Sequence, residues 1–577
     1  MPGCRTRRPE PLKVIDVWAI AGVLAVVAVV ALLAALTHSL GIPRNDDWAY
    51  RRVLAEFART GQLKFVGWGS MTLVGQILWA TPFVLVFGGG QWVPSISTAV
   101  LAGIGLVCAY LLARGQLSRG SAIASVLLVV ALPGFALNTA DFMTDVPAFS
   151  AEMACLLLGA LAVRSTGPAQ LAWLGGSMVA GLFGFSIREF DIAAPAAVVV
   201  VLAASRRLEL RACALAAAGL LGACGAVYWW ASSLPGGQPK ALGLPTSASL
   251  EVLGGAYFTL SFMVSPLVPW AVVRWRAWRL GPSSAAAAIA LAAGLLLVAH
   301  HHPLFIGNYL DQQGAGGGRV LAGTRPELFP VAAWEAFRVI ALVAGAGFAG
   351  ALVALGADGL IGRSLGRGAH FYDQPKATVE VEGGLLLAFT WLSAGVLVGY
   401  GLLFRAAFWD RYLWPVVFGV AVLLLGRRRA SPPGYLKVLR PLRVALTSSL
   451  ALLVGVVAVA VTLNADAYDA ARWSAGEDLV KAGYPPGAID AGFDWVGDHA
   501  TVVARPGRAV ASAPGYEMWY DQMFPGFQDC ALVSGSRLLW TSLRLVRITS
   551  YDEVAFAGTE HLYIYVAHSP RCDVPGP

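Results

Sequence analysis

Two adjacent carboxylates, Asp46 and Asp47, follow the first long apolar run of the sequence. Apolar residues recur at helical spacing over residues 50–58, and Gly61 ends that pattern, which predicts an amphipathic helix on a membrane surface with Asn45 as its N-cap. A carboxylate in the first turn of a helix balances the positive end of the helix dipole. A carboxylate beside a water-filled cavity can instead act as a general base, and the residues alone leave both roles open.

A second acidic pair, Asp141 and Asp145, is separated by one helical turn and is followed by Pro147. A carboxylate and a proline at this spacing are typical of a helix start. Ionisable groups at the mouth of a membrane span usually face the protein interior, because exposing them to lipid is costly. The pair is therefore either a helix cap or part of a buried polar site.

Guanidinium groups suited to phosphate binding occur in two further segments. Arg188 and Glu189 precede Asp191 in a short turn between two apolar runs, where a local ion pair is the plainer interpretation. Farther along the chain, Arg405 and Arg411 lie among aromatic residues. Planar guanidinium groups bind phosphate oxygens with two donors, although contact with lipid headgroups would also explain arginines at this depth.

Three other features give weaker signals. His300–His302 are consecutive, and neighbouring residues on a helix point in different directions, so their spacing is poor for a single metal ion. The run Gly314–Gly318 lacks the strand-to-helix context of a phosphate-binding loop and is more typical of a flexible lid. Cys530 and Cys572 fall in the polar C-terminal region, where an oxidising compartment would allow them to pair.

The composition places these residues in a membrane protein. Of the 577 residues, 57% are hydrophobic and 13% are charged, about half the charged fraction of a soluble globular chain. The net charge of +8 is scattered over short loops, which argues against a nucleic-acid-binding surface. About thirteen apolar runs approach the twenty or so residues that a membrane-spanning helix needs. These runs are 14–37, 94–113, 121–137, 147–163, 171–187, 190–204, 212–231, 252–273, 283–300, 331–356, 384–404, 413–426 and 443–463.

Positive charge in the short loops predicts the topology. The most basic loops all lie in the cytoplasm if the apolar run 71–87 does not cross the membrane, and all lie outside if it does. We therefore expect 71–87 to lie at the outer interface as a juxtamembrane or re-entrant segment. This assignment puts the N-terminus in the cytoplasm. It places four regions outside the inner (plasma) membrane: 38–93, 138–146, 300–330 and 464–577.

The expected architecture has two parts. Residues 1–463 form an all-α polytopic membrane domain whose first outer loop carries juxtamembrane helices. Residues 464–577 form a small extracytoplasmic α/β domain. Within this second part, 465–482 reads as a helix, whereas 543–550 and 561–567 read as strands.

The candidate carboxylates and arginines converge on the outer face of the predicted topology. Soluble nucleotide donors belong to the cytoplasm, so a transferase on this face needs an activated substrate carried in the membrane, and a polyprenyl phosphate meets that need. An aspartate would take the proton of an acceptor hydroxyl, and arginine would stabilise the departing lipid phosphate. A single displacement of this kind inverts the configuration at the anomeric carbon of the transferred sugar.

These residues resemble the motifs of the GT-C superfamily of integral-membrane glycosyltransferases. The likeness is to bacterial relatives of the protein O-mannosyltransferases and of the enzyme that adds aminoarabinose to lipid A. Such proteins carry an Asp-acid-x-x-Tyr motif in the first outer loop, matched here by 46–50, with Asp where many relatives have Glu. Their second outer loop carries an aspartate near the start of a span, as Asp145 does. An Arg-Tyr-Leu-x-Pro element before a late span is matched by 411–415.

By this resemblance Asp46 is the catalytic base, supported by Asp47 and Asp145, and Arg411 binds the donor phosphate. The candidate set is completed by Arg405, Tyr412 and Arg188 at the donor phosphate and by Asp141, Glu189 and Tyr50 in support. Some GT-C enzymes use a divalent metal and others do not, so no cofactor is certain. The implied partners are a polyprenyl-phosphate-linked sugar donor, a lipid, glycan or protein acceptor, and membrane lipids, but no nucleic acid.

Other function classes also fit a polytopic chain with outer charges. A transporter or flippase places ionisable groups nearer the membrane midplane and often has repeated halves, whereas no repeat is visible here. An O-antigen ligase or polymerase of the cell envelope also uses outer arginines, and only the acidic motifs argue against it. A membrane scaffold would leave the loop carboxylates expendable. The sequence identifies neither the sugar nor the acceptor.

Overall fold

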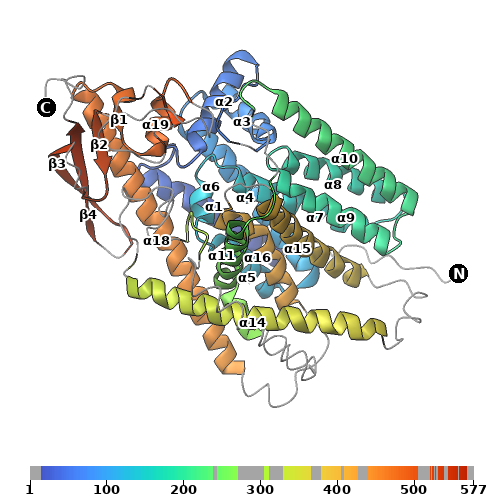
Figure 1. Ribbon diagram of the computed structural model, residues 1–577. Helices are drawn as coiled ribbons and strands as arrows, with labels where there is room; N and C mark the ends of the chain where they lie inside the picture. The colour runs from blue at the N-terminus through green and yellow to red at the C-terminus, as the bar shows by residue number, and fades with distance from the viewer. Residues whose placement is uncertain are drawn as a thin grey trace.

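The structure is a computed structural model in which most of the chain can be described. The described residues are 14–69, 71–237, 243–270, 305–310, 329, 331–364, 378–403, 408–426, 440–503, 520, 523–525, 527, 530–537, 543–555 and 558–567. Helices dominate these residues, and a small sheet lies at one end of the helical bundle (Figure 1). The expectation of an all-α membrane part with a small α/β part is confirmed.

Most of the predicted spans are helices. They are α1 (Val14–Leu36), α4 (Trp92–Gln116), α7 (Asp145–Arg164), α8 (Pro168–Phe185), α9 (Ala193–Ala204), α10 (Leu210–Ser233), α11 (Ser247–Met263), α14 (Val331–Ser364), α15 (Thr378–Leu403), α16 (Trp414–Leu425) and α18 (Arg440–Lys481). Among the described residues, six helices are long and apolar enough to cross a membrane: α1, α4, α7, α10, α15 and α18. The predicted span 283–300 lies outside the described residues, and α14 runs crosswise to α18 in Figure 1, so the count of thirteen stays a prediction.

Helix α7 lies inside the bundle and carries much of the site. It packs against α4, α8, α9 and α15. Small residues let the backbones approach closely, as is common where helices pack inside a membrane. A Cβ atom on Gly105 of α4 would collide with Ser150 of α7, and one on Gly159 of α7 would collide with Val198 of α9. These contacts hold α7 at a defined depth and rotation.

The predicted span 121–137 is not one helix. It is divided into α5 (Arg119–Val130) and α6 (Phe135–Thr139), which corrects the sequence-based expectation. The break ends at Gly134, whose φ of +82° is a left-handed conformation that glycine adopts without strain. The ring of Tyr309 occupies the space where a Cβ of Gly134 would lie, so a residue distant in sequence helps to fix the interruption.

We expect Gly134→Ala to destabilise the protein by more than about 1 kcal/mol, because alanine is strained at positive φ and its Cβ would collide with Tyr309. The measurement is the apparent melting temperature of the purified protein. Gly175→Ala is the matched control, since a Cβ at this α8 position meets nothing within 4 Å and alanine favours a helix. Equal melting temperatures for the two variants would contradict the packing argument.

The first outer loop contains two helices, α2 (Asp47–Thr60) and α3 (Val74–Phe87). The predicted helix and its end at Gly61 are confirmed, with Gly61 in the left-handed conformation at φ +69°. Asn45 is not the N-cap as expected: the N-cap residue is Asp46, and Asn45 itself has a φ of +51°. Helix α3 is about 21 Å long, and its place at the outer interface stays a prediction.

The apolar face of α2 is covered by protein. Trp48 is fully buried, and its ring contacts those of Phe493 and Phe524 from the C-terminal region at centroid distances of 5.9 and 5.6 Å. Figure 1 shows α2 and α3 beside α19 (Phe493–His499) at the same end of the molecule. The expectation of a helix resting on the membrane surface is therefore corrected, because the C-terminal region provides the apolar partner that the pattern requires.

The C-terminal part is built on the continuation of α18, which runs without interruption past residue 464. Its four strands are β1 (Ile489–Asp490), β2 (Ala531–Ser534), β3 (Leu543–Asp552) and β4 (Thr559–Ala567). The sheet order is β1-β2-β4-β3, with β1 parallel to β2 and the other pairs antiparallel. The predicted helix 465–482 and both predicted strands are confirmed, and the division of the chain at 463/464 stays a prediction.

Candidate active site

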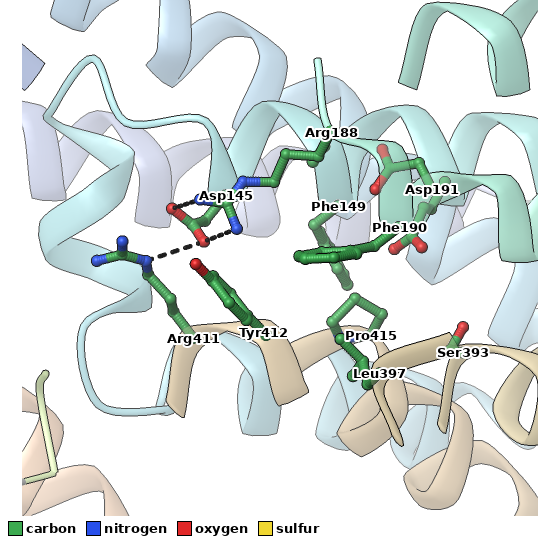
Figure 2. A pocket seen from close by; sticks show the side chains of 12 residues that line it. Asp145, Phe149, Arg188, Phe190, Asp191, Ser393, Leu397, Arg411, Tyr412 and Pro415 are labelled. Carbon is green, nitrogen blue, oxygen red and sulfur yellow. Dashed lines mark hydrogen bonds and ion pairs between the residues drawn. The ribbon is translucent and has the colours of Figure 1, made fainter. Parts of the chain in front are cut away.

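Two of the three arginines predicted at the donor phosphate, Arg188 and Arg411, meet on one carboxylate, Asp145 (Figure 2). Asp145 Oδ1 lies 3.0 Å from Arg188 Nη1 and 3.1 Å from Arg411 Nε. All three side chains are almost fully buried. Two guanidinium charges share one carboxylate charge, so this group of three carries a net positive charge that suits an anion such as a phosphate.

Three distant parts of the chain position these groups. Asp145 is the first residue of α7, Arg188 directly precedes the short helix η1 (Glu189–Ile192), and Arg411 lies in the short helix η4 (Asp410–Leu413). Each therefore stands where a helix begins. The ion pairs to Asp145 bring the starts of these three helical segments together.

Further contacts orient the two arginines. Arg188 Nε donates to Thr144 Oγ1 at 2.6 Å, and its guanidinium carbon lies 4.6 Å from the ring centre of Tyr412. Arg411 Nη1 donates to Asn308 Oδ1 at 2.7 Å. Tyr412, which the sequence predicted at the donor phosphate, gives Arg188 a cation–π contact.

Asn308 is a site residue that the sequence analysis missed. It has a φ of +100° and follows Gly307, which also has positive φ, so the chain makes a tight turn beside the site. Asp410 fastens this turn by accepting the amides of Tyr309 and Leu310 at 2.8 and 2.6 Å. A Gly-Asn pair is a recognisable turn signal, and it was the one available clue.

Asp46 stands at the edge of this group and is accessible. Its Oδ2 lies 4.0 Å from Arg411 Nη2, and its side chain is 22% exposed, compared with 3% for Asp145 and 0% for Asp47. Trp68 Nε1 donates to Asp46 Oδ1 at 2.7 Å, and the Tyr50 hydroxyl donates to Oδ2 at 3.4 Å. A base must reach its substrate, and among these acids Asp46 has the access.

Asp47 points elsewhere. Its carboxylate binds Arg51 through Oδ1 at 2.5 Å and Oδ2 at 2.9 Å, and Oδ2 also accepts the amide of Phe142 at 3.1 Å. These contacts join the first outer loop to the second. Although the sequence grouped Asp47 with Asp46 as a catalytic acid, its observed contacts suit a residue that positions the loops.

Asp141 belongs to a buried ionic cluster in which Arg44 is surrounded by three carboxylates. Arg44 lies 2.7 Å from Asp141, 2.6 Å from Asp466 and 2.7 Å from Asp469. The cluster ties both outer loops to helix α18. Arg472 also pairs with Asp469, which leaves Arg44 facing both Asp141 and Asp466. Burial raises the pKa of Asp141 to about 8. Asp141 therefore supports the site from a distance, holding its proton at neutral pH.

We expect Asp141→Asn to leave folding intact near neutral pH, because asparagine mimics the protonated acid and still accepts from Arg44. The raised pKa of Asp141 means that the native state holds a proton that the unfolded chain releases near pH 4. The stability that the bound proton of Asp141 contributes is complete below about pH 4 and is lost as the pH rises through about 8. The melting temperature of the variant, relative to that of the wild type, should therefore rise as the pH increases from 5 to 9. Parallel pH profiles would contradict this assignment.

Two pockets flank the short helix η1. The first is open on one side, encloses about 400 Å³ counting that opening, and has Asp145, Arg188 and Arg411 at one end (Figure 2). The second is lined by Glu189, Met71 and other residues of the first outer loop and of α10. The Tyr50 hydroxyl contacts Met71 Sδ at 3.1 Å, so this second pocket adjoins the residue that contacts Asp46.

Several predicted features cannot be placed. Arg405, His300–His302 and Gly314–Gly318 lie outside the described residues. Cys530 is disulfide-bonded, but Cys572 also lies outside the described residues. Within the described part of the chain, no group of three or more His, Cys, Asp or Glu side chains is arranged to hold a metal ion. Metal dependence therefore stays open.

One protein family matches part of this chain. Residues 76–230 match the model of a family described as dolichyl-phosphate-mannose-protein mannosyltransferase. The match contains Asp145 and Arg188 but neither Asp46 nor Arg411, and it spans little more than a quarter of the sequence. It confirms, for this segment, the resemblance to GT-C glycosyltransferases that the motifs indicated. A comparison with curated protein sequences found no match.

Solved structures show a distant likeness over most of the chain. ArnT from Cupriavidus metallidurans in the apo state is 15% identical with a TM-score of 0.38, covering 96% of this chain and 99% of ArnT. ArnT bound to undecaprenyl phosphate has 13% identity, a TM-score of 0.38 and the same coverage. The apo oligosaccharyltransferase of Archaeoglobus fulgidus has 13% identity and a TM-score of 0.38, covering 86% of this chain and 62% of its own. Residues cannot be paired reliably at this level, so the site rests on contacts within this chain.

Proposed function

We propose that this protein is a membrane glycosyltransferase that moves a sugar from a polyprenyl-phosphate-linked donor to an acceptor hydroxyl on the extracytoplasmic face. The observation that carries the proposal is the meeting of an accessible carboxylate with a buried cationic pair. Asp46 lies 4.0 Å from Arg411, which shares Asp145 with Arg188. A base and an anion-binding group this close together can both reach one sugar phosphate.

The reaction is a single displacement. The donor phosphate binds Arg411 and Arg188, whose guanidinium groups both pair with Asp145. Asp46 takes the proton of the acceptor hydroxyl as its oxygen attacks the anomeric carbon. The bond between that carbon and the phosphate oxygen breaks, and the lipid phosphate leaves with its negative charge stabilised by the arginines. Attack opposite to the leaving group inverts the anomeric configuration.

Asp145 and Tyr50 act on these groups rather than on the substrate. Asp145 holds both arginines at a fixed separation, so that their orientation is set before the donor arrives. Tyr50 and Trp68 hold the two oxygens of Asp46. Asp47 and Asp141 join the outer loops that carry these residues. Each of the four predicted aspartates thus has a role, but Asp46 is the one that touches the acceptor.

The description of the matched family supports the proposed class of donor. That description names dolichyl-phosphate-mannose, which is a sugar on a polyprenyl phosphate, and proteins as the acceptor. We carry over the donor class and leave the acceptor open among lipid, glycan and protein. The proposed location is the inner (plasma) membrane, with the N-terminus in the cytoplasm and the C-terminal domain outside.

The test is mass spectrometry of envelope lipids, glycans and proteins from cells with and without the gene. We expect one sugar to disappear from one acceptor and its polyprenyl-phosphate-linked form to accumulate. Purified protein in lipid nanodiscs should then transfer that sugar from the lipid donor with inversion. Unchanged envelope glycans together with no transfer from any polyprenyl-phosphate donor would reject the proposal in favour of a transporter or scaffold.

A further inference from the structure

The first pocket continues past the arginines along one face of helix α7. Asp145, Ala148, Phe149 and Glu152 all line it, and their spacing of three, four and seven residues places them on the same side of the helix. Glu152 lies two turns from Asp145, about 10.5 Å along the helix axis. The pocket therefore has a second polar end. No sequence motif marks this end, and the proposed reaction does not use it.

Three side chains from three helical segments form this end. Asp191 of η1 and Ser393 of α15 lie at the end of the pocket opposite Arg411 (Figure 2), and Glu152 lines the same pocket. Their exposed fractions are 3% for Glu152, 4% for Asp191 and 5% for Ser393. Within the described part of the chain, Glu152 Oε2, Asp191 Oδ2 and Ser393 Oγ have no hydrogen-bond partner. Buried polar atoms without partners are rare in folded proteins and indicate a missing ligand or water.

The walls between the two ends are largely aromatic. Phe149, Phe190 and Tyr412 line the pocket between the arginine end and the end with Asp191 (Figure 2). A ligand that fits must therefore present an anion at one end, apolar surface in the middle and hydrogen-bond donors at the other end. A sugar phosphate has these properties, because its ring carries C–H faces and its hydroxyls donate. An isoprenoid chain has no donor to offer to two carboxylates.

We propose that Glu152, Asp191 and Ser393 form the subsite that binds the hydroxyls of the donor's sugar and thereby selects which sugar is transferred. The inference rests on the proposed function, since it requires the donor phosphate to lie at Arg188 and Arg411. Two helical turns separate the anion-binding end from Glu152, which leaves one sugar ring between them. The carboxylates accept hydrogen bonds from sugar hydroxyls, and Ser393 adds a third polar contact from the facing helix.

The experiment compares two classes of lipid on the full-length protein in nanodiscs. One is bare undecaprenyl phosphate, and the other is a panel of undecaprenyl-phosphate-linked pentoses and hexoses. For the wild type, we expect at least one sugar-bearing lipid to bind more tightly than the bare phosphate. Glu152→Gln and Asp191→Asn should each reduce this preference about tenfold or more while changing the affinity for the bare lipid less than twofold, because each amide replaces one acceptor oxygen of the subsite with a donor nitrogen. Glu56→Gln, an exposed carboxylate paired with Arg59, is the matched control and should change neither value.

Ser393→Ala keeps the test decisive if a carboxylate variant fails to fold. Loss of one neutral hydrogen bond should lower the preference for the sugar-bearing lipid over the bare lipid about 2- to 10-fold. The affinity for the bare lipid should stay unchanged. The subsite is rejected if no sugar-bearing lipid is preferred, if the folded variants keep the preference, or if they weaken both lipids equally. The proposed function itself is rejected if bare undecaprenyl phosphate does not bind to the wild type. It is also rejected if this lipid binds Arg411→Ala as tightly as it binds the wild type.

Discussion

Asp46→Asn is expected to lower the rate of sugar transfer by about 100- to 10,000-fold, the usual contribution of a general base. Asparagine keeps the shape of the side chain and can still accept from the indole of Trp68, so the site should remain assembled. It cannot take a proton from the acceptor hydroxyl. The measurement is single-turnover transfer in nanodiscs, together with the affinity for undecaprenyl phosphate, which should not fall.

Asp47→Asn is the matched control for this variant, since it is the neighbouring residue and the same chemical change. Asp47 is fully buried against Arg51 and the Phe142 amide, so its replacement should lower the melting temperature. The transfer rate of the molecules that stay folded should fall far less than that of Asp46→Asn. Retained activity in Asp46→Asn, or equal losses per folded molecule in the two variants, would remove Asp46 from the role of base.

Arg411→Ala is expected to weaken donor binding about 10- to 150-fold, which corresponds to a hydrogen bond to a charged group of roughly 1.5–3 kcal/mol. The loss should appear in the donor KM and in kcat, while the acceptor KM changes little, because the guanidinium stabilises both the bound and the departing phosphate. Arg411→Lys should fall between the wild type and alanine, since lysine keeps the charge but not the planar pair of donors.

Arg59→Ala is the control for charge removal from the same outer region. Arg59 is exposed and pairs only weakly with Glu56 one turn away, so both donor parameters should match those of the wild type. A donor KM and kcat that are unchanged in Arg411→Ala would contradict the phosphate-binding role. Equal losses in Arg59→Ala would point instead to a general electrostatic attraction of the anionic donor.

The helical elements could be predicted because their signal is local. Apolar runs of about twenty residues in a chain with 13% charged residues have few alternatives to membrane helices. The strands β3 and β4 were visible as alternating patterns in a polar region. The division of the run 121–137 was not visible, because the Tyr309 ring that occupies the space beside Gly134 comes from a segment far along the chain.

The roles of the two adjacent aspartates show a different limit. Neighbouring residues on a helix point about 100° apart, so Asp46 and Asp47 cannot both face one site. The sequence offers no means to decide which of them does. Packing of α2 against its neighbours turns Asp47 inward to Arg51 and leaves Asp46 near Arg411. Glu152 was missed for a related reason, since a single acid in an apolar helix has no motif to mark it.

By itself, the sequence determined that this is a helical membrane protein, and it marked the loop positions that carry carboxylates and arginines. Those properties follow from composition and short-range spacing. Only the tertiary structure decided that Asp145 pairs with both Arg188 and Arg411, that Asp46 lies 4.0 Å from Arg411, and that Arg44 gathers three other acids. These residues are distant along the chain, so their proximity depends on how the helices pack, and no local pattern encodes that.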